Sequence, residues 1–325
     1  MASKSGPETL QQAILFFSDY ENCKRAVEAI RWTDGVVKCP TCGSEKVTYL
    51  AKQRRWKCYE QHAKAQFSLK VGTLFEDSPI GLEKWLPALW LVTACKNGIS
   101  SYELSRALGV TQKTAWFMLS RLRLALQGKG GGKLSGEVEV DETFIGGKAR
   151  NMHKGKLRRL HLTMNNPMVG KVAVMGVLER GAKGESQVRL ERIPSNRRRH
   201  VRPVIDAHIE QGATIYSDSL RSYRHLSQAD SDYVHNVIDH AQAYVDGNIH
   251  TNGLENFWSL LKRAIKGTYV LVEPFHLFRY LDEQAFRFNN RAGTDAARFA
   301  LALKGIINKR LTYVALTGSE LPQTC

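Results

Sequence analysis

Three carboxylic acids stand where a carboxylate is difficult to explain unless it binds something. Asp141 lies inside an apolar, strand-like run, Asp218 ends a second such run, and Glu255 lies in an amphipathic helical segment. Burying a carboxylate in an apolar strand is costly unless a cation compensates its charge. Hard Mg²⁺ or Mn²⁺ ions bind carboxylates, substrate oxygens and water, and two ions about 3.5–4 Å apart promote phosphodiester cleavage. The acids therefore suggest metal-dependent chemistry on a phosphodiester.

A lysine accompanies the third acid, and each acid also has an ordinary structural interpretation. Lys262 follows Glu255 by seven residues, about two helical turns, so both lie on one helix face and the lysine could hold a phosphate. Asp218 could instead cap a helix, and Glu255 could complement a helix dipole. Asp141 could be a satisfied polar strand residue. Glu142 points to the opposite strand face and is the weaker metal candidate.

A second group of potential metal ligands lies near the N-terminus. Cys39-Pro-Thr-Cys42-Gly43 has the knuckle spacing of a zinc ribbon, in which two close thiolates bind Zn²⁺ and the glycine permits a tight turn. Cys58 and His62 follow and could complete a tetrahedral site with structural zinc. The alternative is a ribbon that has lost its metal and persists through packing.

The segment that holds the three acids alternates between strand and helix patterns. Because strand ends of such sheets often present ligand-binding groups, a mixed α/β domain would suit an active site at Asp218. The expected strands are 136–145, 171–178, 186–193, 213–217 and 233–238, and the expected helices are 197–211, 220–226 and 253–266.

The preceding region is helical and contains a candidate helix-turn-helix. Residues 100–108 form a short amphipathic helix, Gly109 permits a tight turn, and Thr111 is a good N-cap for a helix over 112–127. Such a pair would place its second helix in the DNA major groove, although an ordinary helical hairpin has the same pattern. The expected base contacts are Gln112, Lys113 and Thr114, and the expected phosphate contacts are Arg121 and Arg123.

The charge of the chain favours a polyanionic partner. Lysine and arginine exceed aspartate and glutamate by 47 − 31 = +16. Two basic runs flank the proposed catalytic strands, and we interpret them as phosphate contacts, although most basic runs are only solvated surface. Their members are Lys148, Arg150, Arg197, Arg198 and Arg199.

The sequence shows no membrane or export signal. No apolar run approaches the roughly 20 residues needed to span a bilayer, and the N-terminus lacks the apolar core of a secretory signal. Six cysteines are too few and too uneven for a secreted disulfide framework. We therefore expect a cytoplasmic protein associated with the nucleoid.

These sequence patterns predict a multidomain protein of the α+β and α/β classes. The expected parts are an N-terminal helical segment (1–35), a zinc ribbon (36–75), a helix-turn-helix domain (76–127), a glycine-rich linker (128–135), a catalytic domain (136–295) and a C-terminal helical tail (296–325).

Several motifs together resemble insertion-sequence DDE transposases, which carry an N-terminal zinc ribbon and a ribonuclease H-like, integrase-type core. The motifs are Val-Glu-Val-Asp141-Glu-Thr-Phe-Ile-Gly-Gly-Lys148, Tyr216-Ser-Asp218, His250-Thr-Asn-Gly-Leu-Glu255-Asn-Phe-Trp-Ser-Leu-Leu-Lys262-Arg, Gly267-Thr-Tyr269 and the run from Phe278 to Arg291. The resemblance, over about residues 15–295, implies that Asp141, Asp218 and Glu255 bind the catalytic metals and that Lys262 assists them. Some relatives carry asparagine as the third member, so Asn252 and Asn256 are alternatives. The family usually has a second Cys-x-x-Cys, from which Cys58-Tyr-Glu-Gln-His62 departs.

The resemblance implies a bacterial insertion-sequence transposase. Its N-terminal domains would recognise the terminal inverted repeats, and its core would cleave the transposon ends with two Mg²⁺ or Mn²⁺ ions. The freed 3′-hydroxyl would then attack target DNA. Relatives of this kind generally act as dimers or larger assemblies on DNA. Two alternatives remain: a structure-selective nuclease or resolvase with the same metal chemistry, and a non-catalytic DNA-binding regulator.

Overall fold

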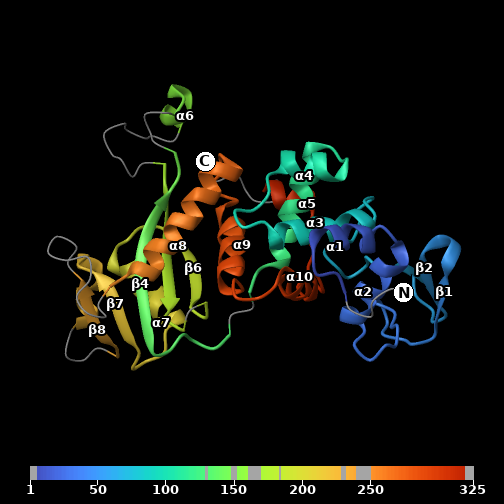
Figure 1. Ribbon diagram of the computed structural model, residues 1–325, viewed down its shortest axis with the longest axis horizontal. Helices are drawn as coiled ribbons and strands as arrows, with labels where there is room; N and C mark the ends of the chain where they lie inside the picture. Colours follow the sequence, from blue (N-terminus) through green and yellow to red (C-terminus); the bar gives the residue numbers. More distant parts are fainter. Residues whose placement is uncertain are drawn as a thin grey trace. The chain divides into compact units, whose positions relative to one another are not determined.

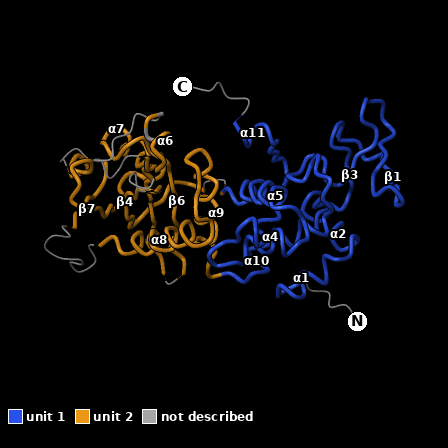
Figure 2. The backbone as a smooth tube through the Cα atoms, turned by 90° about the horizontal axis from the view of Figure 1, so that it is seen from above, with its two compact units in different colours: residues 1–127, 293–325 blue, residues 128–292 orange. Residues whose placement is uncertain are grey.

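The chain divides into two compact units. The computed structural model describes residues 6–128, 131–147, 152–159, 170–182, 184–227, 232–238 and 250–318. One unit comprises Met1–Gln127 together with Gly293–Cys325, and the other comprises Gly128–Ala292 (Figure 2). Among the helices of these described ranges, none is long and apolar enough to cross a membrane.

The first unit is mainly helical. Residues 10–32 form two helices because the Asp19 carboxylate accepts a hydrogen bond from the Glu21 backbone N–H at 3.0 Å and so begins a second helix. The helices of this unit are α1 (Leu10–Phe17), α2 (Tyr20–Arg31), α3 (Leu82–Ala94), α4 (Ser101–Leu108), α5 (Gln112–Ala125), α10 (Asp295–Lys304) and α11 (Tyr313–Thr317).

Helix α10 packs into the core of this first unit. The ring of Phe299 lies 5.3 Å from the ring of Phe17 and 5.1 Å from that of Trp90, measured between centroids. The Arg298 side chain also donates to the carbonyl of Thr93 on α3 at 3.3 Å. The segment predicted as a C-terminal helical tail, residues 296–325, thus groups with the N-terminal unit.

A small antiparallel sheet completes the first unit. It has the order β1 (Val47–Leu50), β2 (Arg55–Cys58) and β3 (Gln66–Ser68), with a 3₁₀ turn, η1 (Ala51–Gln53), between the first two strands. Trp56 is buried at its centre, stacked on Phe67 at a centroid distance of 5.8 Å and beside Tyr49 at 4.8 Å. An aromatic cluster therefore substitutes for the large core that so short a sheet cannot build.

The second unit is built on a five-stranded mixed sheet. Its strands are β4 (Glu137–Ile145), β5 (Val172–Glu179), β6 (Gln187–Ile193), β7 (Thr214–Asp218) and β8 (Val234–Ile238). The spatial order is β6-β5-β4-β7-β8. The pairs β4–β5 and β5–β6 are antiparallel, and β4–β7 and β7–β8 are parallel.

Helices cover both faces of this sheet (Figure 1). One core packs α7 (Arg198–His208) and the 3₁₀ segment η3 (Arg221–Ser227) against one face, and the other core packs α8 (Asn252–Arg263) and α9 (Leu277–Asn289) against the opposite face. Strand β5 is buried along almost its whole length, as expected for a strand covered on both sides. A short helix, α6 (Lys154–Arg159), and a π-helical segment, η4 (Ala264–Tyr269), complete the unit.

Candidate active site and metal centre

Asp141 lies half-buried on the central strand β4, where it pairs with Gly176 of β5. Burial, together with the negative charges of Asp218 and Glu255, raises the pKa of the Asp141 carboxyl to about 6. The indole N–H of Trp258 opposes this effect by donating to Asp141 Oδ2 at 2.8 Å. Because Asp218 and Glu255 both act on the Asp141 carboxyl, the three predicted acids lie in one neighbourhood.

Asp218 ends β7, which runs beside β4 in the same direction. In the ladder that joins them, Glu139 pairs with Tyr216, and Asp141 and Asp218 each stand two residues beyond that pair. Both acids therefore lie toward the carboxyl ends of neighbouring parallel strands, where α/β sheets commonly bind ligands. Asp218 Oδ1 also accepts the backbone N–H of Leu220 at 3.2 Å, so the acid also makes a turn-forming hydrogen bond.

Glu255 and Lys262 lie at opposite ends of α8. Glu255 is in the first turn of the helix and Lys262 in the last, and both side chains are exposed. The buried face of α8 packs against β4 and β5 in the second core. Asn252 and Asn256, the alternative third ligands, are exposed on the same helix. Each of these polar groups is therefore accessible to a substrate.

The three acids do not form a closed cluster of metal ligands. Among the residues that the structure describes, the group whose ligand atoms all lie within 4.8 Å of one another consists of three cysteines and a histidine, and does not include Asp141, Asp218 or Glu255. Carboxylates of like charge repel one another when no cation lies between them. A two-ion site is also wider than a single coordination shell, because its ions stand about 3.5–4 Å apart.

A buried carboxylate ties the start of α8 to β4. Glu139 is 1% exposed. Its Oε1 accepts from Arg180 Nε at 2.9 Å, and its Oε2 accepts from the backbone N–H of Leu254 at 2.9 Å. Arg180 also donates to the carbonyl of His250 at 2.6 Å. Because Glu139 satisfies a backbone donor in the first turn of α8, it fixes the helix one residue before Glu255.

Sequence reasoning did not identify Glu139, although a signal was present. Residues two apart on a strand share a face, so Glu139 and Asp141 both point toward α8. A glutamate in the apolar run that holds Asp141 needs a partner in the same way as the aspartate does. That partner, Arg180, lies just past the end of β5, where no local pattern in the sequence reveals it.

Close packing brings the Trp258 indole to Asp141. A Cβ atom on Gly176 would lie 2.6 Å from Trp258 Cζ2 and 2.8 Å from Leu254 Cδ2. Only glycine leaves room for α8 to approach the sheet this closely. Gly176 is also the residue paired with Asp141. Because glycine has no side chain, α8 can approach the sheet at this point and the Trp258 indole can reach the Asp141 carboxylate.

Glu142 faces the other side of β4. Burial, against the opposing effect of the Tyr223 hydroxyl and with the negative charges of Asp141 and Asp218, raises its pKa to about 8. Tyr223 belongs to the core formed with α7 and η3. Glu142 is thus mostly protonated at neutral pH and separated by the strand from α8, which leaves it the weaker metal candidate.

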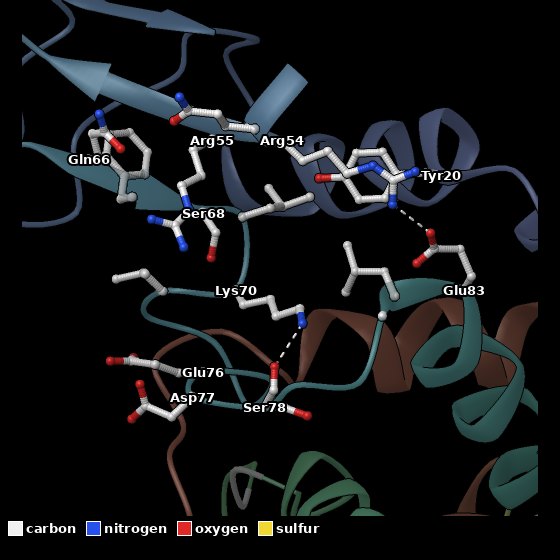
Figure 3. Close-up of a pocket in the computed structure, with 16 residues that line it drawn as sticks. Tyr20, Arg54, Arg55, Gln66, Ser68, Lys70, Glu76, Asp77, Ser78 and Glu83 are labelled. Atoms are coloured by element: carbon white, nitrogen blue, oxygen red, sulfur yellow. Dashed lines mark hydrogen bonds and ion pairs between the residues drawn. The ribbon is translucent and has the colours of Figure 1, made fainter. Parts of the chain in front are cut away.

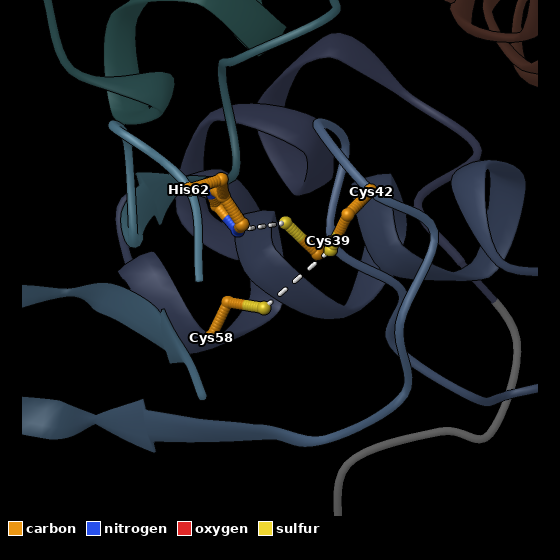
Figure 4. A group of neighbouring side chains, drawn as sticks. All are labelled: Cys39, Cys42, Cys58 and His62. Carbon is orange, nitrogen blue, oxygen red and sulfur yellow. Dashed lines mark hydrogen bonds between the residues drawn. The ribbon is translucent and has the colours of Figure 1, made fainter. Parts of the chain in front are cut away.

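Cys39, Cys42, Cys58 and His62 form a compact cluster in the first unit (Figure 4). Cys39 Sγ lies 3.5 Å from His62 Nε2, and Cys42 Sγ lies 3.7 Å from Cys58 Sγ. Around a tetrahedral zinc with bonds of about 2.3 Å to sulfur and about 2.0–2.1 Å to nitrogen, ligand atoms stand about 3.5–3.8 Å apart. The spacing of the cluster therefore fits zinc, and the Cys₃His set supports a structural ion.

The backbone around the knuckle prepares its thiols for a metal. Gly43 adopts φ 76° and donates its N–H to the carbonyl of Cys39 at 2.8 Å, which closes the turn. Burial alone would raise the pKa of the Cys39 thiol, but the backbone N–H groups of Thr41 and Cys42 lower it to about 7. Burial raises the pKa of Cys58. Zinc binds thiolates, so the knuckle supplies one in advance.

Helices α4 and α5 are joined by a tight turn. Gly109 ends α4 in the left-handed conformation, and the Thr111 hydroxyl caps α5 by accepting the Thr114 N–H at 3.2 Å. Lys113 is exposed in the first turn of α5. The Gln112 amide donates to the Ser101 hydroxyl at 2.8 Å and so helps to hold the two helices together.

The predicted phosphate contacts on α5 are corrected by the structure. Arg121 is 4% exposed and Arg123 is 1% exposed. The Arg121 guanidinium donates to the carbonyls of Leu311 at 3.0 Å, Leu74 at 3.2 Å and Glu76 at 2.8 Å. Both arginines lie on the buried face of the helix, and Arg121 holds distant chain segments together, so neither side chain can meet a DNA backbone.

The structure describes the predicted contacts of only one of the two basic runs. Arg197, Arg198 and Arg199 are all exposed at the start of α7. Lys148 and Arg150 lie outside the described residues.

The first unit also contains a cavity of about 440 Å³ between the small sheet and the loop that precedes α3 (Figure 3). Its central cations already have partners within the fold. Lys70 Nζ donates to the carbonyls of Ser78 at 2.9 Å and Ile80 at 2.6 Å. Arg54 pairs with Glu83 at 2.8 Å. These side chains support the loop, and they are committed to that role.

Two regions of the chain match known protein families. Residues 133–289 match the ISXO2-like transposase domain, and residues 18–62 match the transposase zinc-ribbon domain. The first match includes all three acids and Lys262, and the second ends at His62.

Two known proteins are similar to this chain. An uncharacterized protein in the transposable element ISH50 of Halobacterium salinarum is 28% identical over 239 residues, which cover 72% of this chain and 79% of that protein. An uncharacterized transposase-like protein of Haemophilus influenzae is 34% identical over 89 residues, which cover 27% of this chain and 69% of that protein.

Proposed function

Because this chain belongs to the ISXO2-like transposase family, we propose that it cleaves DNA at the ends of an insertion sequence and joins the freed 3′-hydroxyl to target DNA. The basic character of the chain suits this substrate, since net +16 attracts a polyanion.

We interpret the second unit as a ribonuclease H-like core. Its first three strands form an antiparallel meander, and its last two add in parallel on the other side of β4. This order and the helices on both faces support the interpretation. In such a core the first strand, β4, and the fourth strand, β7, carry the first two acids, which agrees with Asp141 and Asp218.

The observation that carries the proposal is the relation among the three acids. Asp141 and Asp218 stand in equivalent positions on neighbouring parallel strands, and Glu255 acts electrostatically on Asp141 from α8. Burial and the two neighbouring negative charges raise the pKa of Asp141, so the ionised form of this acid needs compensation by positive charge. A pair of divalent ions would supply that compensation, and we propose that these three residues hold Mg²⁺ or Mn²⁺. When bound, the ions would activate the attacking oxygen and neutralise the leaving one.

The surrounding residues have separate roles in this proposal. Lys262, exposed two turns beyond Glu255, binds a phosphate of the DNA as a point charge. Trp258 orients the Asp141 carboxylate through its indole N–H. Glu139 is a positioning residue that holds the start of α8 against β4. Zinc in the first unit is structural and takes no part in the chemistry.

We propose that the first unit recognises the terminal inverted repeats. We interpret the tight turn between α4 and α5 as that of a helix-turn-helix, which would present Lys113 together with Gln112 and Thr114 at the start of the second helix. Arg197, Arg198 and Arg199 would contact phosphates near the core. Paired ends would be held by a dimer or a larger assembly.

The decisive experiment incubates the protein with duplexes that carry the ends of its own element. With Mg²⁺ the wild-type chain should produce a new 3′-hydroxyl at the element boundary, and removal of Mg²⁺ should abolish the product. Asp218→Asn should lower the cleavage rate by about a thousandfold, equivalent to about 4 kcal/mol of transition-state stabilisation. Asp206→Asn, a matched change on α7 where the carboxylate pairs with Arg202, should leave cleavage intact. Metal-dependent cleavage that survives Asp218→Asn would refute the proposed site.

A further inference from the structure

The chain reverses direction after α8 and η4 through a strained three-residue turn. Val270 adopts φ 62° and ψ −58°, and the Leu271 N–H donates to the carbonyl of Tyr269 at 2.6 Å. These values define a γ-turn of the rare type with positive φ. A β-branched residue in this conformation is a clear outlier, and such strain persists only where the surrounding structure imposes it.

The turn exposes apolar side chains. Val270 is 76% exposed and Leu271 is 70% exposed, the two highest values among the large hydrophobic side chains of the described residues. Scattered single apolar residues on a surface are ordinary, but here two consecutive ones stand at the tip of a strained turn. Neither core of the second unit includes them.

A buried network of hydrogen bonds and an ion pair supports the turn. The Tyr269 ring packs edge-on against Tyr280 at a centroid distance of 4.7 Å, and its hydroxyl donates to Glu283. Glu283 is buried and paired with Arg287, which also donates to Gln284 at 2.9 Å. A buried, charge-assisted network of this kind restricts its members to one geometry. It therefore keeps Val270 and Leu271 outside the core.

The surroundings of the turn are basic. Lys262, Arg263 and Lys266 are exposed on the helical segment that leads into it, whereas Glu273 is the single acid between residues 262 and 276. This charge attracts a polyanion and repels the same surface of a second copy of the chain. An apolar tip among phosphate-binding groups matches the way in which proteins insert side chains between the stacked bases of DNA.

We propose that Val270 and Leu271 form a wedge that enters the base stack of the DNA held by Lys262, an inference that rests on the proposed function. Fifteen residues separate Glu255 from Val270, which corresponds to about 20 Å along the helical segment. At 3.4 Å per base pair, the wedge would open a step about six base pairs from the scissile phosphate. Strain at Val270 and its buried support keep the wedge extended before DNA arrives.

The test uses duplexes of the element ends with 2-aminopurine placed at successive positions. On binding of the Asp218→Asn protein, which retains the wedge, fluorescence should rise several-fold at one step about six base pairs from the cleavage site. Val270→Gly should abolish most of this rise. Glycine favours positive φ, so this variant relieves strain and should fold at least as stably as the wild type. Leu271→Ser should act similarly, and Leu15→Ser, a change at another highly exposed leucine, should not.

The outcomes separate the wedge from the proposed function. If the wild type cleaves DNA and the fluorescence rise is as large with Val270→Gly as without it, the wedge is wrong and the proposed function stands. Fluorescence enhancement that depends on Val270 without any cleavage would support the wedge and overturn the proposed function. If Val270→Gly changes the mass of the DNA-free assembly and leaves the fluorescence unchanged, the surface binds another copy and the wedge is wrong.

Discussion

The two candidate metal sites of this protein differ in how far the chain alone assembles them. In the first unit, three sulfur atoms and a histidine nitrogen already lie within 4.8 Å of one another, with the Cys39–His62 and Cys42–Cys58 atom pairs at 3.5 and 3.7 Å. In the second unit, the three acids influence one another electrostatically but lie outside such a compact group. The difference follows from ligand chemistry, since thiol and imidazole groups can approach one another closely, whereas carboxylates of like charge repel.

The comparison suggests two kinds of metal site in one chain. A structural site is closed, and its ion adds to the folding stability of a small sheet whose core is limited to an aromatic cluster. A catalytic site must stay open to substrate oxygens and to water. In the proposed acid site, Glu139 and Trp258 would hold the ligands near enough for metal and DNA to complete it.

Loss of the structural ion should have the largest effect. Cys58→Ser should reduce bound zinc from about one ion per chain to nearly none, as measured by elemental analysis. Structural zinc contributes about 10–16 kcal/mol in small zinc-binding peptides, so hydrogen exchange should become fast throughout β1, β2 and β3. Exchange in β5 of the second unit should be unchanged. Cys95→Ser, outside the cluster, is the control, and protected exchange in β1–β3 of zinc-free protein would contradict the closed, structural character of the site.

Removal of the main support of the acid site should have the next largest effect. Glu139→Ala leaves Arg180 without its buried carboxylate and should lower the free energy of unfolding by about 3–5 kcal/mol. It should also reduce cleavage by about 10–100-fold, the usual effect of losing a group that orients metal ligands.

A conservative variant sharpens this test. Glu139→Gln keeps an acceptor for the Leu254 N–H and should recover part of the activity and stability. Glu191→Ala, an exposed change on β6, should alter neither quantity. Equal urea midpoints for Glu139→Ala and the wild type would show that α8 is held by other contacts.

Gly176→Ala tests the packing that carries Trp258 to Asp141. The added methyl group would overlap the indole, so the free energy of unfolding should fall by about 1–3 kcal/mol. The Mg²⁺ concentration needed for half-maximal cleavage should rise as the Trp258 hydrogen bond to Asp141 is displaced. Gly147→Ala, where a Cβ meets nothing within 4 Å, is the matched control. A wild-type melting temperature for Gly176→Ala would show that the helix can move away without cost.

His235 gives the smallest expected effect, on the pH dependence of stability. It lies between the Ser217 and Ser227 hydroxyls, with ring nitrogens 2.7 and 2.6 Å from them. Burial, assisted by the charge of His225, lowers the pKa of His235 from 6.5 to about 4. Between those values the unfolded chain binds a proton that the folded chain excludes, so the free energy of unfolding should fall as the pH decreases from 6.5 to about 4.

Urea denaturation at several pH values measures that slope. His235→Gln should make it shallower, and His153→Gln, at an exposed position, should not. An unchanged slope in His235→Gln would assign the acid sensitivity to other groups. The pH dependence that His235 causes arises in the second unit, whereas the zinc site belongs to the first unit.

Local patterns in the sequence predicted most elements of the second unit. Alternation of apolar residues predicted β4, and short apolar runs predicted the other four strands, to within a few residues. The cysteine spacing likewise predicted the zinc ligands, since the Cys39–Cys42 knuckle is a local structure. Charged residues were harder to interpret. Arg121 and Arg123 follow the basic pattern of a DNA-binding helix, but the structure buries both.

What the sequence could not predict depends on contacts between distant residues. Arg180 meets Glu139 across 41 positions, and the Leu254 N–H meets it across 115. Strand pairing and helix packing create these neighbours, and neither partner carries a local signature. The strained turn at Val270 is a second feature that the sequence could not predict. Positive φ favours glycine, so the sequence would point to Gly267, three residues earlier, whereas the positive φ occurs at Val270.

The return of α10 to the first unit has a consequence for how the protein is made. A ribosome that has synthesised residue 292 has already delivered every part of the second unit, whereas the first unit, begun much earlier, still lacks Phe299 between Phe17 and Trp90. The second unit, which occupies the middle of the sequence, is therefore complete before the first unit, which needs both ends of the sequence. Translation that stops early would release an intact central domain attached to an incompletely folded partner, with the apolar surface of α3 uncovered.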